Sequence, residues 1–159
     1  MGGPRWTPAE RLWRRVDKSA GPTGCWLWTG GVNDAGYGKI RVGDSTLKTH
    51  RLAYELSTGE PIPAKMQIDH LCRVTRCCNP QHLRLATNKQ HQEHRQGAQR
   101  NSRSGIRGVW QTPSGRWRAQ FRHNGKNIYP GTFDTAEEAG EAARLGRNER
   151  FTHNDADRR

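Results

Sequence analysis

The sequence has little apolar material and few acidic side chains. Hydrophobic residues make up 31% of the 159 positions, and 15 Asp and Glu stand against 27 Lys and Arg, a formal net charge of +12. A chain with so little apolar surface to bury needs a metal, disulfides or a partner to hold small units together. The excess of positive charge predicts a polyanionic partner.

Long apolar runs are also missing. No stretch approaches the roughly 20 apolar residues that cross a bilayer, and the opening MGGPRWTPAERLWRRV contains no apolar core of the signal-peptide kind. A basic amphipathic helix with a broad apolar face is absent too, so we expect no membrane partner and favour nucleic acid as the polyanion. The expected location is the cytoplasm, where thiols stay reduced.

Only four cysteines occur, three of them in the segment DHLCRVTRCCNP. The spacing Cys72-x4-Cys77-x4-His82 places three soft or borderline ligands in one loop, which Cys25 can complete as a tetrahedral structural Zn²⁺ site. Bound zinc would contribute folding free energy to a loop without regular structure. Alternatively, the thiols are only small buried side chains. Cys78 is left outside the predicted ligand set.

Residue patterns predict an α+β protein with two domains. We expect the first domain at 1–95, a polar linker at 96–104, a second domain at 105–151 and a frayed tail at 152–159. The first domain should contain, in order, a helix capped by Thr7 and Glu10, two strands within CWLWTGGVNDAGYGKIRV, a helix from Thr49 to Gly59, the strands AKMQIDH and LRLAT, and a helix bearing His91, His94 and Arg95.

The second domain shows three runs typical of strands. GIRGVWQT, GRWRAQFRH and KNIYPGTF are separated by the turn signals PSG and NG. Thr135 and Glu138 form a capping box for a helix that reaches about Phe151. A three-stranded antiparallel sheet packed on one helix suits a unit of this size.

A second group of polar residues remains once the zinc ligands are set aside. Asp69 and His70 end a predicted strand, Asn79 lies in the loop that follows, and His91 lies on the next helix. A divalent ion held by a carboxylate and a helix residue would neutralise charge on the leaving oxygen of a phosphodiester. A neutral histidine can take a proton from the attacking water, and an asparagine carbonyl can hold its ring in the required tautomer.

Residues 13–95 resemble the HNH endonucleases of the His-Me finger (ββα-metal) superfamily in CWLWTG, GYGKI, HRLAYEL..G.PIP and DHLCRVTRCCNPQHL. The HLC…RC.NP.HL part is also similar to His-Cys box homing endonucleases, which carry a structural zinc there. The resemblance implies His70 as general base, Asn79 as the middle residue of the motif, and Asp69 with His91 as ligands of a catalytic Mg²⁺ (or Mn²⁺). The final residue of the motif, His91 in this chain, is often Asn in the superfamily. A histidine at this position shifts the metal preference of the site towards softer divalent ions. The predicted zinc ligands match the family's as well.

Basic residues near these motifs are candidates for DNA contact. Arg41, His50 and Arg51 can hold the scissile phosphate, although they can equally be ordinary basic surface. Between His94 and Phe133 there is no Asp or Glu. There the alternation in RWRAQFR places a polar set on one face of a strand, where it can bind phosphates and guanine edges or simply face solvent: Arg116, Arg118, Gln120 and Arg122.

Residues 104–151 resemble the AP2 DNA-binding domain in SGIRGV, GRWRAQFR and GTFDTAEEAGEAA. The resemblance implies a sheet docked in the major groove, with DNA contacts from Arg107, Gln120, Arg122 and Tyr129. Base preference cannot be carried over, because the chain departs from the plant pattern at four contact positions: Trp110, Thr112, Ser114 and Asn127. AP2 units joined to HNH nucleases are a combination found in mobile phage genes.

The sequence therefore predicts a phage-encoded, metal-dependent endonuclease of the homing type that cuts double-stranded DNA. One chain carries one predicted active site, so a double-strand break would need a homodimer or two successive nicks. Two alternatives stay open: a sequence-specific DNA-binding protein in which the metal-binding unit is only a scaffold, and a phage packaging or restriction nuclease. RNA is a less favoured substrate because no module for stacking single strands is evident.

Overall fold

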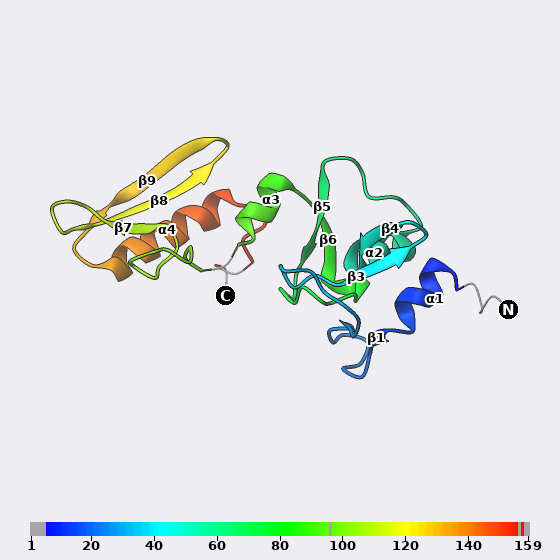
Figure 1. Ribbon diagram of the computed structural model, residues 1–159. Helices are drawn as coiled ribbons and strands as arrows, with labels where there is room; N and C mark the ends of the chain where they lie inside the picture. The colour runs from blue at the N-terminus through cyan, green and yellow to red at the C-terminus, as the bar shows by residue number, and fades with distance from the viewer. Residues whose placement is uncertain (1–5, 96, 156, 158–159) are drawn as a thin grey trace. The chain divides into compact units, whose positions relative to one another are not determined.

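The computed structural model describes residues 6–95, 97–155 and 157 (Figure 1). The chain divides into two compact units, residues 1–88 and 89–159. The start of the N-terminal segment, the first residue of the predicted linker and parts of the predicted tail lie outside the described residues.

The first unit places small antiparallel sheets around two α-helices. Each of its sheets has two strands, in the pairs β1-β2, β3-β4 and β5-β6. Its elements are α1 (Pro8–Trp13), β1 (Val16–Asp17), β2 (Leu27–Trp28), β3 (Lys39–Val42), β4 (Ser45–Lys48), α2 (Thr49–Thr58), β5 (Met66–His70), the 3-10 helix η1 (Pro80–His82) and β6 (Leu83–Thr87).

Several predicted boundaries are confirmed because they depend on local signals. Thr7 and Glu10 form the predicted capping box of α1, and α2 ends at Gly59, whose φ of 75° suits a residue without a Cβ. β5 and β6 pair in antiparallel register, which sets Asp69 opposite Arg84. This hairpin positions the candidate catalytic residues at its end.

The predicted pairing near the N-terminus needs a correction. We expected the two strands within CWLWTGGVNDAGYGKIRV to face each other across a glycine-rich turn, but β2 pairs with β1 and β3 pairs with β4. The sequence STLK of β4 has one apolar residue and is mostly exposed, so it lacked the alternation that marks a strand. Gly43 has a φ of 59° in the turn that joins β3 to β4.

The core of the first unit is small and joins residues from most of its elements. Its buried members are Leu12, Trp28, Ile40, Leu52, Ala53, Ile68, Cys78 and Leu83. Cys78 therefore packs in the apolar core, as a thiol without a metal can.

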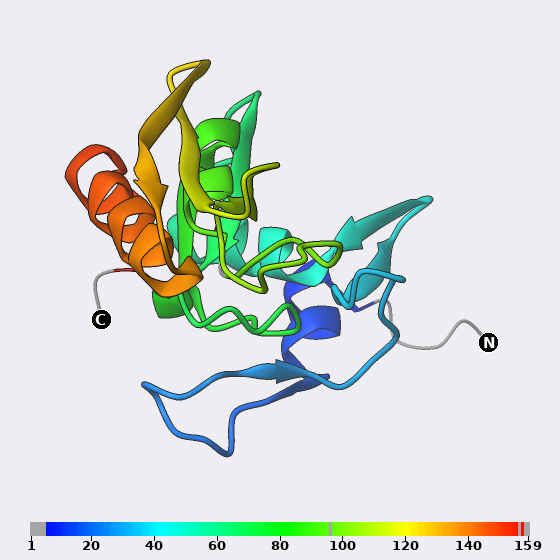
Figure 2. The same ribbon diagram turned by 90° about the vertical axis from the view of Figure 1, so that its left-hand side faces the viewer.

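The second unit joins a three-stranded antiparallel sheet to one long helix. α3 (Asn88–Glu93) precedes β7 (Val109–Gln111), β8 (Trp117–His123), β9 (Lys126–Phe133) and α4 (Ala136–Arg150), and the strand order is β7-β8-β9. Figures 1 and 2 show α4 lying along one face of this sheet. Small residues allow the close packing: Ala139 and Ala143 are fully buried, and a Cβ on Gly146 would come 2.6 Å from the Phe121 ring.

Three details of this unit differ from expectation or refine it. The register of β8 against β9 shifts between Ala119 and Phe121, a bulge that accommodates Pro130 inside a strand. α3 ends at Glu93, so the predicted helical face bearing His94 and Arg95 is shorter than expected. A frayed tail is wrong for Asn154 and Asp157, which hydrogen-bond to α4.

No helix in the described part of the chain combines the length and apolar character needed to span a membrane.

Candidate active site and metal centre

Four predicted ligands converge in the first unit. The ligand atoms of Cys25, Cys72, Cys77 and His82 all lie within 4.8 Å of one another. Cys25 comes from the loop before β2, the other cysteines from the loop after β5, and His82 from η1. Segments far apart in the sequence thus meet at one point, as they do around a structural zinc ion.

The imidazole of His82 is oriented for this cluster. Its Nδ1 lies 3.6 Å from the sulfurs of both Cys25 and Cys77, and its Nε2 lies 3.0 Å from the carbonyl oxygen of Thr23. Because a carbonyl only accepts, Nε2 carries the proton and donates it to Thr23. Nδ1 is then left with its lone pair towards the sulfurs, the arrangement in which a histidine binds a metal.

Hydrogen bonds among the thiols separate their pKa values. A hydrogen bond from the Cys72 thiol, with a further one from the backbone N–H of Asn79, lowers the pKa of Cys77 to about 4, although burial opposes the shift. The same Cys72–Cys77 bond raises the pKa of Cys72, and burial raises that of Cys25. Three sulfur atoms and an imidazole lone pair face one centre, so this Cys3His cluster could hold zinc.

Asp69 is fixed by an arginine that sequence analysis missed. Its carboxylate is buried, and Oδ2 accepts hydrogen bonds of 3.1 Å from both Nε and Nη2 of Arg84. The two residues face each other across the β5-β6 pair. Two donors from one guanidinium hold a carboxylate in one orientation. Only the strand register could have revealed this partner.

His70 is oriented by a main-chain carbonyl. The ring is buried, and its Nε2 lies 3.1 Å from the carbonyl oxygen of Cys77. Nε2 must therefore donate, which makes Nδ1 the basic nitrogen of the neutral ring. We expected the side-chain carbonyl of Asn79 to hold this tautomer, and that expectation is wrong. The carbonyl that orients His70 belongs to Cys77, one of the residues of the Cys3His cluster.

Asn79 instead holds the loop together. Its Nδ2 donates to the carbonyls of Pro22 and Gly24, at 3.0 and 2.7 Å, and its Oδ1 accepts from the backbone N–H of Gln81 at 3.1 Å. The side chain is fully buried. Asn79 therefore caps η1 and anchors the segment that precedes Cys25, a position that supports the metal cluster.

Two further aromatic side chains surround His70. The centroids of the His50 and His70 rings lie 4.8 Å apart in an edge-on arrangement. The centroid of the Tyr37 ring lies 5.1 Å from that of His50. His50 is buried, and its Nδ1 has no hydrogen-bond partner among the described residues. Burial, followed by repulsion from the protonated form of His70 and from Lys48 and Arg51, lowers the pKa of His50 to about 3. A ring that stays neutral packs against the candidate base.

The other predicted residues of the nuclease site are more scattered. Arg41 is exposed on β3, where its Nε donates to the Gly43 carbonyl, and Arg51 is half-buried on α2. His91 is half-buried on α3 and belongs to the second unit, whereas Asp69 belongs to the first. Their pairing as ligands of one catalytic ion stays a prediction.

The predicted DNA-contacting residues of the second unit fall into two groups. Arg118 and Arg122 are exposed on β8, Tyr129 is 55% exposed on β9, and Gln120 is half-buried. Arg116 is exposed but donates to Asp134 at 2.8 Å. Arg118, Gln120 and Arg122 alternate with the buried strand residues on β8, so they share the face opposite to α4.

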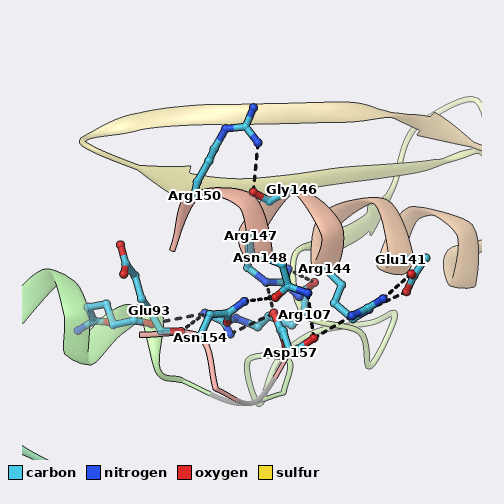
Figure 3. A network of polar contacts seen from close by, with 11 residues as sticks. Glu93, Arg107, Glu141, Arg144, Gly146, Arg147, Asn148, Arg150, Asn154 and Asp157 are labelled. Atoms are coloured by element: carbon cyan, nitrogen blue, oxygen red, sulfur yellow. Dashed lines mark hydrogen bonds and ion pairs between the residues drawn. The ribbon is translucent and has the colours of Figure 1, made fainter. Parts of the chain in front are cut away.

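Arg107 has a different environment from the exposed group. Its Nη2 donates to the carbonyl oxygens of Gln92 and Glu93, and Nη1 lies 3.8 Å from Asp157, which also accepts from Arg147 (Figure 3). Burial, together with the charge of Arg147, lowers the pKa of Arg107 to about 10. The side chain holds α3 and the C-terminal segment in place, so contact with DNA would require it to leave these partners.

Comparisons with known proteins agree with this division. An HNH endonuclease family model matches residues 47–93, and an AP2 domain model matches residues 104–151. The chain is similar to Protein 7.7 of Escherichia phage T7, with 42% identity over 69 residues that cover 43% of this chain and 52% of that protein. Protein 2.8 of the same phage is 30% identical over 81 residues, which cover 51% of this chain and 54% of that protein.

A third relative is covered more fully. The uncharacterized gene 5.3 protein of Enterobacteria phage T3 is 34% identical over 77 residues, which cover 44% of this chain and 75% of that protein. The chain spans about half the length of the two phage T7 relatives. No solved structure matches the chain. The two domain matches indicate a nuclease or DNA-binding role: the chain contains an HNH endonuclease domain followed by an AP2 domain.

Proposed function

We propose that this protein is a metal-dependent DNA endonuclease of the homing type, which hydrolyses a phosphodiester bond in double-stranded DNA. The observation that carries the proposal is the hydrogen bond between Nε2 of His70 and the Cys77 carbonyl. Because Nε2 donates, Nδ1 is the nitrogen that accepts a proton in the neutral form of this buried ring. The ring follows an oriented carboxylate, Asp69, in the chain, as suits a general base near a metal ligand.

Each residue then has a separate task. His70 would take a proton from the attacking water at Nδ1. Asp69 and His91 would hold a divalent ion, Mg²⁺ or Mn²⁺, which when bound neutralises charge on the leaving oxygen. Arg84 keeps the Asp69 carboxylate in place. The Cys3His cluster would bind a structural Zn²⁺ and fix the loop whose carbonyl orients His70.

Target recognition would come from the AP2 domain. The exposed Arg118 and Arg122, with Gln120 between them, could contact bases and phosphates in a major groove, and Tyr129 could add contact area. Arg41 and Arg51 would contact phosphates near the cut. Because the relatives are phage proteins, we propose that the protein is phage-encoded and acts in the host cytoplasm, as a homodimer where it cuts both strands.

Cleavage of supercoiled plasmid with Mg²⁺ or Mn²⁺ tests the proposal. Wild type should nick or linearise DNA that carries its target, whereas His70→Ala and Asp69→Asn should bind the same DNA and leave it intact. His153→Ala, a histidine substitution in the C-terminal segment, should cut like wild type. If wild type retards DNA but cuts it with neither ion, the DNA-binding alternative replaces the proposal. Cutting without sequence preference would favour a packaging or restriction role.

A further inference from the structure

A basic pocket lies in the first unit, outside both matched family regions. It has a volume of about 330 Å³ and is formed by α1, β3 and neighbouring residues. Its lining residues are Trp6, Arg11, Arg14, Arg15, Trp28, Lys39, Ile40 and Arg41.

The pocket is rich in positive charge. Five of its lining residues are arginine or lysine, all of them exposed, and no described residue that lines it is acidic. Arg41 forms an ion pair with Asp44 at 3.7 Å, but both side chains are largely exposed and such pairs contribute little. The nearby Glu10 is engaged in the Thr7 capping box. This concentration of cations suits an anion.

The strand register adds an independent observation. Lys39 of β3 lies directly opposite Lys48 of β4. Like charges at directly opposed positions destabilise an antiparallel pair, unless an anion neutralises them. Lys48 also lies 5.0 Å from the Tyr37 ring, which is 6.0 Å from the His70 ring. Positive charge therefore extends from the basic pocket towards the candidate general base within the same unit.

Two arginines of the pocket are already held in position. The Arg14 guanidinium stacks on the Trp6 ring at 4.3 Å from its centroid, and Nη1 of Arg11 donates to the Arg41 carbonyl at 3.1 Å. Side chains that are ordered before binding lose less conformational entropy when a ligand arrives. Guanidinium groups fixed in this way suit phosphate oxygens, to which they can donate two hydrogen bonds at once.

We propose that the basic pocket binds backbone phosphates of the DNA substrate, which extends the first unit's contact with the duplex beyond the contacts proposed for Arg41 and Arg51. The inference depends on the proposed function for the identity of the substrate. Its physical role would be to set the position of the duplex on the unit that carries His70, because phosphate contacts fix register and orientation without reading sequence.

The test compares two double variants of the full chain. Arg14→Gln with Lys39→Gln removes two charges from the pocket, while Lys65→Gln with Arg76→Gln removes two exposed charges elsewhere on the same unit. Affinity for a duplex is measured across a salt series. The pocket variant should bind about tenfold more weakly at low salt, and the slope of log K against log salt should become shallower by about one to two. The control variant should keep the wild-type slope.

A second measurement needs no variant. Acetylation of wild-type lysines, followed by mass spectrometry, should show Lys39 protected by duplex DNA and Lys65 unprotected. Millimolar inorganic phosphate in place of DNA should protect Lys39 poorly, since a free anion lacks the neighbouring phosphates of a duplex. Equal protection by both ligands would mean that the pocket takes any phosphate and would overturn the assignment to DNA.

The outcomes separate this inference from the proposed function. An unchanged salt slope in a folded pocket variant, together with equal labelling of Lys39 and Lys65, overturns the pocket assignment even if wild type cuts plasmid normally. A lower slope in a protein that never cuts DNA would support the pocket and reject the nuclease.

Discussion

Nε2 of His70 lies 3.1 Å from the carbonyl oxygen of Cys77, a residue whose sulfur belongs to the Cys3His cluster. Cys77 thus contributes to both candidate sites. Its main-chain carbonyl contacts the candidate general base, and its sulfur belongs to the candidate zinc site. The cluster is therefore more than a stabilising element, because the geometry of this loop sets the tautomer of His70.

Removal of zinc should abolish cleavage by misplacing the base. Without the metal, the loop that carries the Cys77 carbonyl loses its constraint, and His70 loses its orienting partner. We expect a fall in cleavage rate of at least about a hundredfold, comparable to the typical contribution of general-base catalysis. The check is plasmid cleavage after treatment with a zinc chelator, with Mg²⁺ kept in excess. Added Zn²⁺ should restore activity, and a zinc-free protein that still cuts at the original rate would contradict the link.

The adjacent cysteines offer a matched pair of variants. Cys77→Ser should lose zinc and unfold the loop, because a serine hydroxyl does not replace a cysteine thiolate as a zinc ligand. Cys78→Ala removes a sulfur from the apolar core and should cost about 1 kcal/mol, while zinc stays at one ion per chain. Metal content and urea unfolding distinguish the two. Equal zinc loss in both variants would show that Cys78 also binds the ion.

Arg84 should control the carboxylate of the proposed catalytic site. Arg84→Gln leaves Asp69 buried with a weaker partner, which should lower the free energy of unfolding by about 1–3 kcal/mol. Cleavage should also fall, because the carboxylate is no longer held in one orientation. Arg84→Lys keeps the charge but not the fork, so it should recover stability better than activity. Urea unfolding and cleavage rates measure both. If Arg84→Lys restored full activity, the fork would be unnecessary.

Much of this architecture follows from local sequence signals. The caps of α1 and α4, the end of α2 at Gly59 and the strand pair that delivers Asp69 were all predictable, since each depends on a few neighbouring residues. Three members of the metal cluster were predictable from their spacing in one loop, and Cys25 was the distant cysteine that could complete it.

Other features depend on contacts between distant segments. The partner of His70 is a main-chain carbonyl, which every residue has, so no residue type marks it. The partner of Asp69 depends on strand register. The contacts that hold the Arg107 side chain within the second unit include Asp157, in a C-terminal segment for which the sequence predicted no structure. The amide of Asn79 was assigned to the wrong partner because a motif gives a residue's identity but not the direction of its side chain.

His50 should make stability depend on pH in a defined direction. Its pKa falls from an ordinary value near 6.5 to about 3 in the folded protein, mainly because the ring is buried. Between these values the unfolded chain binds a proton that the folded chain does not, so the free energy of unfolding decreases as pH falls below about 6.5. One group contributes about 1.4 kcal/mol per pH unit, or roughly 2 kcal/mol between pH 6.5 and 5. His50→Gln cannot titrate, so the urea stability of wild type should fall more steeply than that of the variant over this range. Protonation of the zinc ligands affects both proteins and cancels in the difference. Parallel stability curves would mean that the His50 site is open enough to water for the ring to protonate in the folded state.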